Sequence, residues 1–405
     1  MARRKGMELE PTRRTKADVG SLSKIPLTDW QDWKWQQRNR LDWRTADTAR
    51  YFPDLSQQEL QNLQSYSERY KLAVTPYVLD LIERDAQGNP VATDPIWNQF
   101  RYLAPEEYHG IVSTPEEREN WEKPSELPTK ILHHKYPDRA ILRVVNHCFG
   151  HCNYCYLTAR VIDRTHSDNK AGSRNDWEQS LEYLRQHTEI RDVLLSGGDP
   201  LILDNARLDL MLSQLRSIPS IKTIRLNTRV LTFNPFRIDR DLVNLFAEHK
   251  LTALEIHMAH PRELTREVDE RLALFDAAGH RPVFLWRSPL LAGINDNETV
   301  LEELLVKLYE RRITPYYLFH FAPNTLGRTQ RGVAIRAGAA LLSSLRRKIP
   351  GPAFPRYALF HLDGKHDIPL EQGGSSEFLY ENDAAGNPVV RFKNWKHQWV
   401  TYPDI

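Results

Sequence analysis

The sequence predicts an α/β fold: a partial (β/α)6 barrel with an N-terminal helical extension and an extended C-terminal tail. From Lys130 onward, apolar runs of β type alternate with amphipathic stretches, which indicates right-handed βαβ units on a parallel sheet. The expected strands are Ala140–Val145, Asp192–Leu195, Thr223–Leu226, Ala253–Ile256, Pro282–Trp286 and Ile313–Phe319. The expected helices are Asp176–Arg185, Leu208–Leu215, Asp239–Glu248, Arg266–Ala277, Glu298–Arg311 and about Gly332–Arg347. A doubly wound sheet is a less favoured arrangement of the same units.

The region ahead of the barrel is predicted to be helical. A first helix covers residues 29–42, with Asp29 as its N-cap and tryptophans that we expect to pack on the main domain. A second helix covers about residues 57–70. A third begins at Thr75 and Pro76, which have the residue types of a cap and a first-turn proline.

Changes in composition divide the 405-residue chain into segments. Residues from about 85 to 128 are polar and rich in Pro and Glu, as in a linker. The expected segments are a disordered basic tail (1–28), a helical region with its linker (29–128), the βα core (129–349) and a C-terminal oligomerisation segment (350–405). We therefore expect a homo-oligomer.

Composition also bounds the setting and the partners. A net charge of +2 gives no argument for nucleic acid or a membrane as the main partner. We identify no signal peptide and no apolar run near the ~20 residues that span a bilayer. Three clustered cysteines and no others favour a reducing compartment, so we expect a cytoplasmic protein.

All three cysteines follow the first expected strand, at the spacing C-x3-C-x2-C: Cys148, Cys152 and Cys155. Three thiolates this close together can face one metal centre, and the chain has no fourth cysteine to complete a four-thiolate cage. We interpret the motif as a [4Fe–4S] cluster with one iron open to a non-protein ligand. A zinc site that adds His147 or His151, or three unrelated core cysteines, are the alternatives.

Further polar residues follow the later strands, where the active face of a βα fold lies. The second strand is followed by Ser196-Gly197-Gly198-Asp199, whose glycines would let the backbone approach a ligand closely. Asn227-Thr228-Arg229 follows the third strand, His257 the fourth and Arg287 the fifth. Each of these residues could instead be a cap or a polar core residue.

The cysteine motif followed by Ser196–Asp199 resembles the radical S-adenosylmethionine (SAM) superfamily. Further runs resemble the lysine 2,3-aminomutase family, in the same order: Asp32-Trp33-Lys34-Trp35-Gln36-Gln37-Arg38-Asn39-Arg40, Tyr136-Pro137-Asp138-Arg139, Val193–Asp199, Gly293-Ile294-Asn295-Asp296 and Pro315-Tyr316-Tyr317. The resemblance extends from about Asp29 to Tyr402, nearly the whole chain.

The resemblance implies a radical SAM barrel with three cofactors: the [4Fe–4S] cluster, SAM and pyridoxal 5′-phosphate (PLP). PLP would be held as a Schiff base by Lys365, with Tyr136 and Arg139 in its pocket and Arg139 at its phosphate. Ser196, Gly197, Gly198, Asp199, Arg229 and His257 would lie near SAM. Without the resemblance, Lys365 reads as a turn lysine, and the family's glycine-rich run before it is shortened here to Gly364.

The implied activity is an isomerase reaction. An α-amino group of a small-molecule amino acid moves to the β-carbon by way of a 5′-deoxyadenosyl radical. A flavodoxin- or ferredoxin-like protein would supply the electron, and no nucleic acid or membrane would take part.

Two positions depart from the family pattern. Leu157 stands where family members have an arginine that anchors the substrate carboxylate, and Ala322 stands where lysine-specific enzymes have an aspartate for the distal ammonium. A buried ammonium without a carboxylate is costly, so lysine itself is not the expected substrate. Arg160 and Arg287 are the remaining candidates for the carboxylate.

Two other classes of function are alternatives to an aminomutase that acts on a free amino acid. The first is a radical SAM enzyme that acts on a protein-bound lysine or another macromolecule, such as DNA. Near-neutral charge disfavours DNA, and Lys365 disfavours an enzyme without PLP. The second is a non-catalytic electron carrier or zinc-stabilised binding protein, which the ligand-like loop ends disfavour.

Overall fold

The computed structural model describes residues 22, 25–42, 56–101, 123–167, 169–170, 172–322, 325, 327–371 and 375–404. Most of the predicted basic tail, residues 1–21 and 23–24, lies outside these ranges, as do residues 102–122 of the predicted linker. Among the described residues, no helix has both the length and the apolar character that crossing a bilayer requires.

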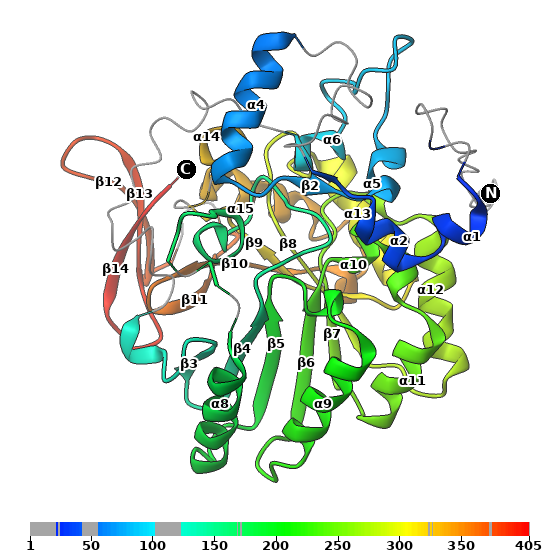
Figure 1. Ribbon diagram of the computed structural model, residues 1–405. Coiled ribbons are helices and arrows are strands. Elements are labelled where there is room, and N and C mark those ends of the chain that lie inside the picture. Colours follow the sequence, from blue (N-terminus) through cyan, green and yellow to red (C-terminus); the bar gives the residue numbers. More distant parts are fainter. Residues whose placement is uncertain are drawn as a thin grey trace, which may run out of the picture.

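The predicted α/β barrel is confirmed (Figure 1). Six parallel strands lie side by side in chain order: β4 (Arg139–Val145), β5 (Asp192–Gly197), β6 (Thr223–Thr228), β7 (Ala253–Ile256), β8 (Val283–Pro289) and β9 (Thr314–Phe319). The helices that follow them are α8 (Arg174–Gln186), α9 (Asn205–Arg216), α11 (Arg240–Glu248), α12 (Arg266–Ala277), α13 (Glu298–Glu310) and α15 (Ile335–Leu345). Each expected strand and helix of the core is present, with bounds shifted by a few residues.

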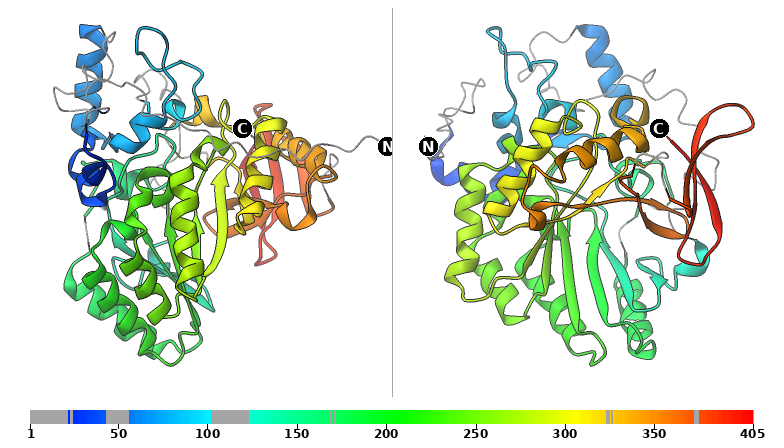
Figure 2. Two further views of the ribbon diagram at one scale, coloured as in Figure 1. Left: turned by 90° about the vertical axis from the view of Figure 1, so that its right-hand side faces the viewer. Right: turned by 180° about the vertical axis from the view of Figure 1, so that it is seen from behind.

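Local sequence explains where these helices begin. Side chains of Ser, Asp, Thr or Asn cap five of them by accepting a backbone N–H of the first turn: Ser173, Asp204, Asp239, Thr265 and Asn297. One face of each helix is then buried, as Leu242, Leu245 and Phe246 are in α11. The helices cover the outer face of the sheet (Figure 2).

The sheet continues beyond the six predicted strands. At one edge, β3 (Leu132–Tyr136) runs antiparallel to β4. At the other edge, β10 (Arg356–His361) adds a seventh parallel strand beside β9, and β11 (Gly364–Asp367) returns antiparallel to β10. The start of the expected C-terminal tail is therefore part of the barrel. Its remainder forms a separate antiparallel sheet of β12 (Phe378–Asn382), β13 (Pro388–Lys393) and β14 (Trp399–Pro403).

The two edges of the nine-stranded sheet meet. The backbone N–H of Lys365 in β11 donates to the hydroxyl oxygen of Tyr136 in β3 over 2.8 Å. The ammonium group of Lys135 in β3 also donates to the carbonyl oxygen of Leu362, between β10 and β11. These contacts nearly close the barrel at Lys365.

The predicted single helix over residues 29–42 is wrong. Two short helices, α1 (Leu27–Trp30) and α2 (Trp33–Arg38), are followed by β1 (Leu41–Asp42), which pairs with β2 (Ala73–Val74). Asp29 lies inside α1, and Asp32 is the cap of α2 because its carboxylate accepts the N–H of Lys34 over 2.8 Å. This capping interaction starts a new helix where apolar periodicity alone predicted continuation.

The rest of the N-terminal region is helical as expected. It contains α4 (Gln57–Arg69), α5 (Pro76–Leu81) and α6 (Trp97–Phe100), with Thr75 as the cap of α5. Single-turn elements complete the fold: α10 (Val230–Phe233), α14 (Arg328–Arg331), η3 (Pro124–Glu126), η5 (Pro200–Ile202), η6 (Pro235–Arg237), η7 (Pro261–Glu263), η8 (Gly351–Ala353) and the π-helix η4 (Thr158–Ile162).

Candidate active site

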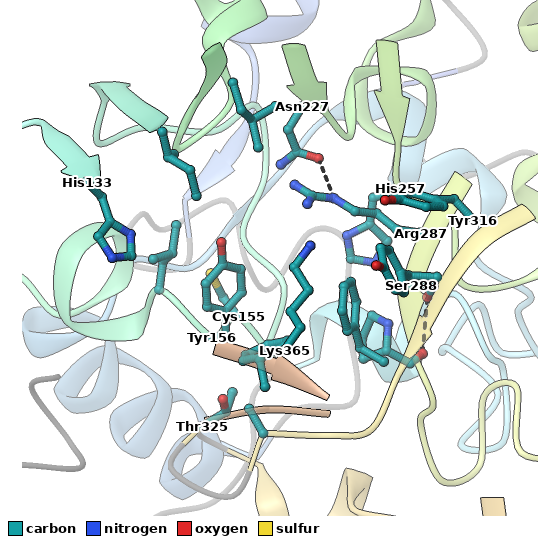
Figure 3. Close-up of a pocket in the computed structure, with 18 of the residues that line it drawn as sticks. His133, Cys155, Tyr156, Asn227, His257, Arg287, Ser288, Tyr316, Thr325 and Lys365 are labelled. Atoms are coloured by element: carbon teal, nitrogen blue, oxygen red, sulfur yellow. Dashed lines mark hydrogen bonds between the residues drawn. The ribbon is translucent and has the colours of Figure 1, made fainter. Parts of the chain in front are cut away.

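A cavity of about 1010 Å³ occupies the interior of the barrel (Figure 3). Its volume is at the upper end for sites that bind small molecules and cofactors. The predicted site residues that line it are Tyr136, Arg139, Cys148, Cys152, Cys155, Gly197, Gly198, Asp199, Arg229, His257 and Lys365. Ser196 is buried and is not among the residues that line the cavity. Residues from nearly the whole length of the core therefore line the same cavity.

The cysteine loop is held in place by the N-terminal region. Arg40 directly precedes β1, and its guanidinium donates to the carbonyl oxygen of Cys148 over 2.6 Å. Further hydrogen bonds join the loop to this region: His151 N to Ala73 O (2.9 Å), Asn153 N to Gln99 O (3.0 Å) and Lys71 Nζ to Asn146 O (3.2 Å). The helical extension is thus a structural part of the site.

The three cysteines are half-buried and line the same cavity. Desolvation raises the pKa of each thiol. Desolvation and the neighbouring Cys152 together raise the pKa of Cys155 to about 12, and Asp199 and the other two cysteines add to the rise at Cys148. The thiols are therefore neutral at pH 7 unless a metal displaces their protons, as a bound metal does. In a [4Fe–4S] cluster each thiolate binds a different iron, so three cysteines around one cavity fit the cluster.

The zinc alternative gains no support. In the described ranges, no group of three or more His, Cys, Asp or Glu side chains, the three cysteines included, converges on a single metal ion. A [4Fe–4S] cluster differs from zinc in this respect, because each of its cysteines binds a different iron. His147 is exposed and is not among the residues that line the cavity. His151 lines it and is buried, and both its ring nitrogens lack a partner among the described residues.

Arg229 lies directly against the cysteines. Its guanidinium approaches the Cys152 Sγ to 2.5 Å and is only 7% exposed. The side chains of Gln99 and Glu263 hold its other nitrogen, Nη2. Burial raises the pKa of Cys152, and the positive charge of Arg229 opposes that rise. Arg229 was expected near SAM. Its observed contact is with Cys152.

Glu263 is a residue that the sequence analysis missed. Its carboxylate is fully buried in η7 and accepts hydrogen bonds from two backbone N–H groups and three side chains: Ala259 N (3.0 Å), His260 N (2.9 Å), Thr232 Oγ1 (2.6 Å), Gln99 Nε2 (2.9 Å) and Arg229 Nη2 (3.4 Å). The signal that could have found it is the capping box of His260 and Glu263 after the fourth core strand.

The two glycines after β5 accommodate the cysteine loop. A Cβ at Gly198 would lie 2.0 Å from the carbonyl oxygen of His147, and Gly197 has a φ of +118°. The next residue, Asp199, donates its backbone N–H to the same His147 carbonyl over 2.7 Å. The expected reason for these glycines was ligand access, whereas the observed contact is between protein backbones.

Asp199 joins two strand ends. Its buried carboxylate accepts the hydroxyl of Thr228 and the backbone N–H of Arg229, both from the end of β6, over 2.8–2.9 Å. Burial raises its pKa to about 6, against the opposing effect of these hydrogen bonds. Asp199 therefore positions Arg229 in addition to lining the cavity.

Lys365 enters the cavity from the β10–β11 hairpin. Its ammonium group lies 4.6 Å from the ring centroid of Tyr317. Burial, with a smaller contribution from the positive charge of Arg287, lowers its pKa to about 8. Gly364 has a φ of +125°, and a Cβ there would meet the Tyr136 hydroxyl at 2.3 Å, so this single glycine is required by the turn.

Arg139 lies beside Tyr136. Its guanidinium is 4.5 Å from the Tyr136 ring centroid and 3.3 Å from the carboxylate of Asp138, and its side chain is half exposed. A lysine amine, an aromatic hydroxyl and a guanidinium that line one cavity fit the expected PLP pocket.

A buried ion network crosses the barrel interior, and the sequence analysis recognised only its Arg287. Arg225 pairs with Asp192 and with Glu255, and Arg287 pairs with Glu255 over 2.9 Å. Glu255 is almost fully buried. Charged residues at inward positions of central strands were the available signal, because such positions are normally apolar.

The positions that depart from the family pattern also line this cavity: Leu157 and Ala322. Arg160 does not; it lines a small separate cavity behind the cysteine loop. Each carboxylate that lines the main cavity already has partners within the described chain: Asp138 with Arg139, Asp192 with Arg225, Asp199 with Thr228, and Asp367 with Arg356. Aromatic side chains form much of the remaining wall: Tyr156, Tyr316, Tyr317, Phe319 and Phe360.

Comparison with known proteins agrees with this geometry. The family model of the radical SAM superfamily matches residues 142–281. The chain is 31% identical over 338 residues to an L-lysine 2,3-aminomutase of Acetoanaerobium sticklandii, covering 84% of this chain and 78% of that one. It is 30% identical over 332 residues to the enzyme of that name from Clostridium subterminale (82% and 76%). It is 29% identical over 402 residues to a glutamate 2,3-aminomutase of Clostridioides difficile (99% and 89%).

Replacing Glu263 should destabilise the protein strongly. In Glu263→Ala, the buried Arg229 loses its carboxylate and two backbone N–H groups lose their acceptor, so we expect a loss of about 3–5 kcal/mol. Urea unfolding measures the change. The matched control is Glu270→Ala on the surface, which breaks an exposed ion pair with Arg266 and should cost less than about 1 kcal/mol. Equal losses in the two variants would contradict the assigned role of Glu263.

Proposed function

Because this chain belongs to the lysine 2,3-aminomutase family, we propose that it is a radical SAM, PLP-dependent amino acid 2,3-aminomutase. It would move the α-amino group of an amino acid to the β-carbon. The observation that carries the proposal is that Lys365 and the three cysteines line one cavity, although they lie far apart in the sequence.

The bound cofactors would supply reductive cleavage of SAM to a 5′-deoxyadenosyl radical, and an electron sink for the migrating nitrogen. Cys148, Cys152 and Cys155 would hold the cluster, and Lys365 would hold PLP through its amine. Arg139 would bind the phosphate of PLP. An external flavodoxin- or ferredoxin-like protein is the proposed electron donor.

The other residues of the chain would bind and orient. Tyr136 fixes the backbone of Lys365 and thereby the origin of its side chain. Arg229 places a fixed positive charge at Cys152, where the cluster would bring negative charge. His257 is kept neutral by burial, which lowers its pKa well below the usual range, and its Nε2 has no partner among the described residues. That nitrogen is free to donate to or accept from SAM.

The substrate class follows from the charges of the cavity. A substrate ammonium would find no unpaired carboxylate among the described lining residues, and Ala322 supplies none. A cationic side chain would therefore be buried without a partner. We propose an amino acid whose side chain carries no positive charge.

The activity is tested with anaerobically purified protein, reconstituted with iron and sulfide. With reductant, SAM and PLP, we expect at least one of the standard amino acids to yield its β-isomer together with 5′-deoxyadenosine. Cys155→Ala should yield neither product, because the cluster loses one of its three ligands. Absence of 5′-deoxyadenosine with every amino acid would refute the radical mechanism.

Attachment of PLP should depend on Lys365 and on pH. Below its pKa of about 8 the side chain is an ammonium and cannot attack the PLP aldehyde, and above it the amine is free. Borohydride trapping of PLP should therefore be half-maximal near pH 8, where an ordinary surface lysine remains protonated. Peptide mass spectrometry locates the label.

The controls for this experiment use two lysines of the same cavity. Lys365→Ala should abolish specific labelling. Lys393→Ala should leave labelling unchanged, because Lys393 is paired with Glu377 over 3.1 Å. Undiminished PLP retention in Lys365→Ala would overturn the assignment of Lys365.

A further inference from the structure

We propose that Arg287 binds a carboxylate of the substrate and supplies the anion site that is missing at Leu157. The inference rests on the proposed function, since it concerns how an amino acid is held in the same cavity. It names the one arginine whose surroundings in the described chain fit that task.

Arg287 is the fifth residue of β8, and its side chain points into the barrel. Its side chain is 19% exposed, and Figure 3 shows it reaching toward the same space as the side chain of Lys365. The charge of Arg287 is the largest electrostatic influence on Lys365 after burial itself. An α-amino acid joined through its amine near Lys365 therefore has its carboxylate within the field of Arg287.

Two partners, the half-buried Asn227 and the buried Glu255, hold the guanidinium in place. Its Nε donates to the Asn227 Oδ1 over 3.0 Å, and its Nη1 pairs with the Glu255 Oε2 over 2.9 Å. Its Nη2 has no hydrogen-bond partner among the described residues. A guanidinium held in this way offers a charge-assisted donor without the entropy cost of immobilising a free side chain.

The other arginines that line the cavity are already engaged. Arg225 uses Nε, Nη1 and Nη2 on Asp192 and Glu255. Arg229 uses Nη1 on Cys152 and Nη2 on Gln99 and Glu263, and its Nε, which has no partner among the described residues, is buried. Arg139 and Arg356 are about half exposed and paired with Asp138 and Asp367.

The ion network leaves Arg287 with a donor to spare. Arg225 bonds to both Asp192 and Glu255, whereas Arg287 pairs with Glu255 alone among the described carboxylates. A substrate carboxylate would accept a charge-assisted hydrogen bond from Nη2 of Arg287, a donor that the apolar side chain of Leu157 does not offer.

The test measures binding without turnover. Holoenzyme without reductant is titrated by calorimetry with L-leucine, L-phenylalanine, L-glutamate and L-lysine, and with the amines formed from each by decarboxylation. Wild type should bind at least one amino acid more tightly than its amine. Arg287→Gln should weaken amino-acid binding by about tenfold to a hundredfold and leave amine binding within about twofold.

Two further variants separate a direct role from a structural one. Arg287→Lys keeps the positive charge but not the planar guanidinium, so it should bind amino acids more tightly than Arg287→Gln and less tightly than the wild type. Arg356→Gln removes another arginine of the same cavity and should leave discrimination between amino acid and amine unchanged. Near-ultraviolet circular dichroism confirms that each variant is folded.

The outcomes identify the carboxylate. Loss of affinity for all four amino acids assigns Arg287 to the α-carboxylate, and loss for L-glutamate alone assigns it to a side-chain carboxylate. The inference is overturned if Arg287→Gln leaves the affinity for every amino acid unchanged, or if the variant loses PLP instead. It is also overturned if the wild type binds no amino acid more tightly than the corresponding amine. Calorimetry reports binding whether or not β-isomers form, so failure of the proposed function would be seen separately, in the product assay.

Discussion

The burial of one positive charge, that of Arg229, constrains much of this structure. A guanidinium this deep in a protein is tolerated only when partners surround it, and its partners come from separate parts of the chain. Gln99 is supplied by the N-terminal helical region, Glu263 by the turn after β7, and Cys152 by the loop after β4. The rings of Phe100, Tyr154 and Phe233 enclose it, each at 5.0–5.5 Å. Barrel, extension and cysteine loop are thus required to meet at one point, which positions the loop that carries the three cysteines.

A second constraint acts at the opposite side of the cavity. Lys365 lies on the last strand of the nine-stranded sheet, and it reaches the interior only because that strand returns to the first one. The contact between Lys365 and Tyr136 therefore has two consequences: it nearly closes the barrel, and it sets the direction of the reactive amine. Gly364 is the residue that makes the approach feasible, because any Cβ there would collide with the Tyr136 hydroxyl. The same contact between Lys365 and Tyr136 therefore nearly closes the barrel and places the Lys365 amine.

The sequence predicted the core of this fold well because its signals there are local. Apolar runs gave the strands, helical periodicity gave the helices, and three clustered cysteines gave the candidate metal centre. The errors arose where distant partners decide. Asp32 begins a second helix where periodicity alone continued the first, and Gly198 is explained by the backbone of His147 rather than by a ligand. Glu255 and Glu263 were missed because a charged residue on a strand or turn has no visible partner until the fold supplies it.

The ion network explains how Arg225 and Arg287 share a cavity with Lys365, for which the proposed chemistry needs a neutral amine. Asp192 and Glu255 offset the charges of Arg225 and Arg287, so these four residues carry no net charge before any ligand enters. Burial then decides the state of Lys365, whose pKa falls to about 8. Had Glu255 been apolar, Arg287 would lack its buried counterion, and no ion pair would offset the desolvation cost of its charge. The buried carboxylate thus allows one arginine to face the cavity with a donor still free, beside an amine that can lose its proton.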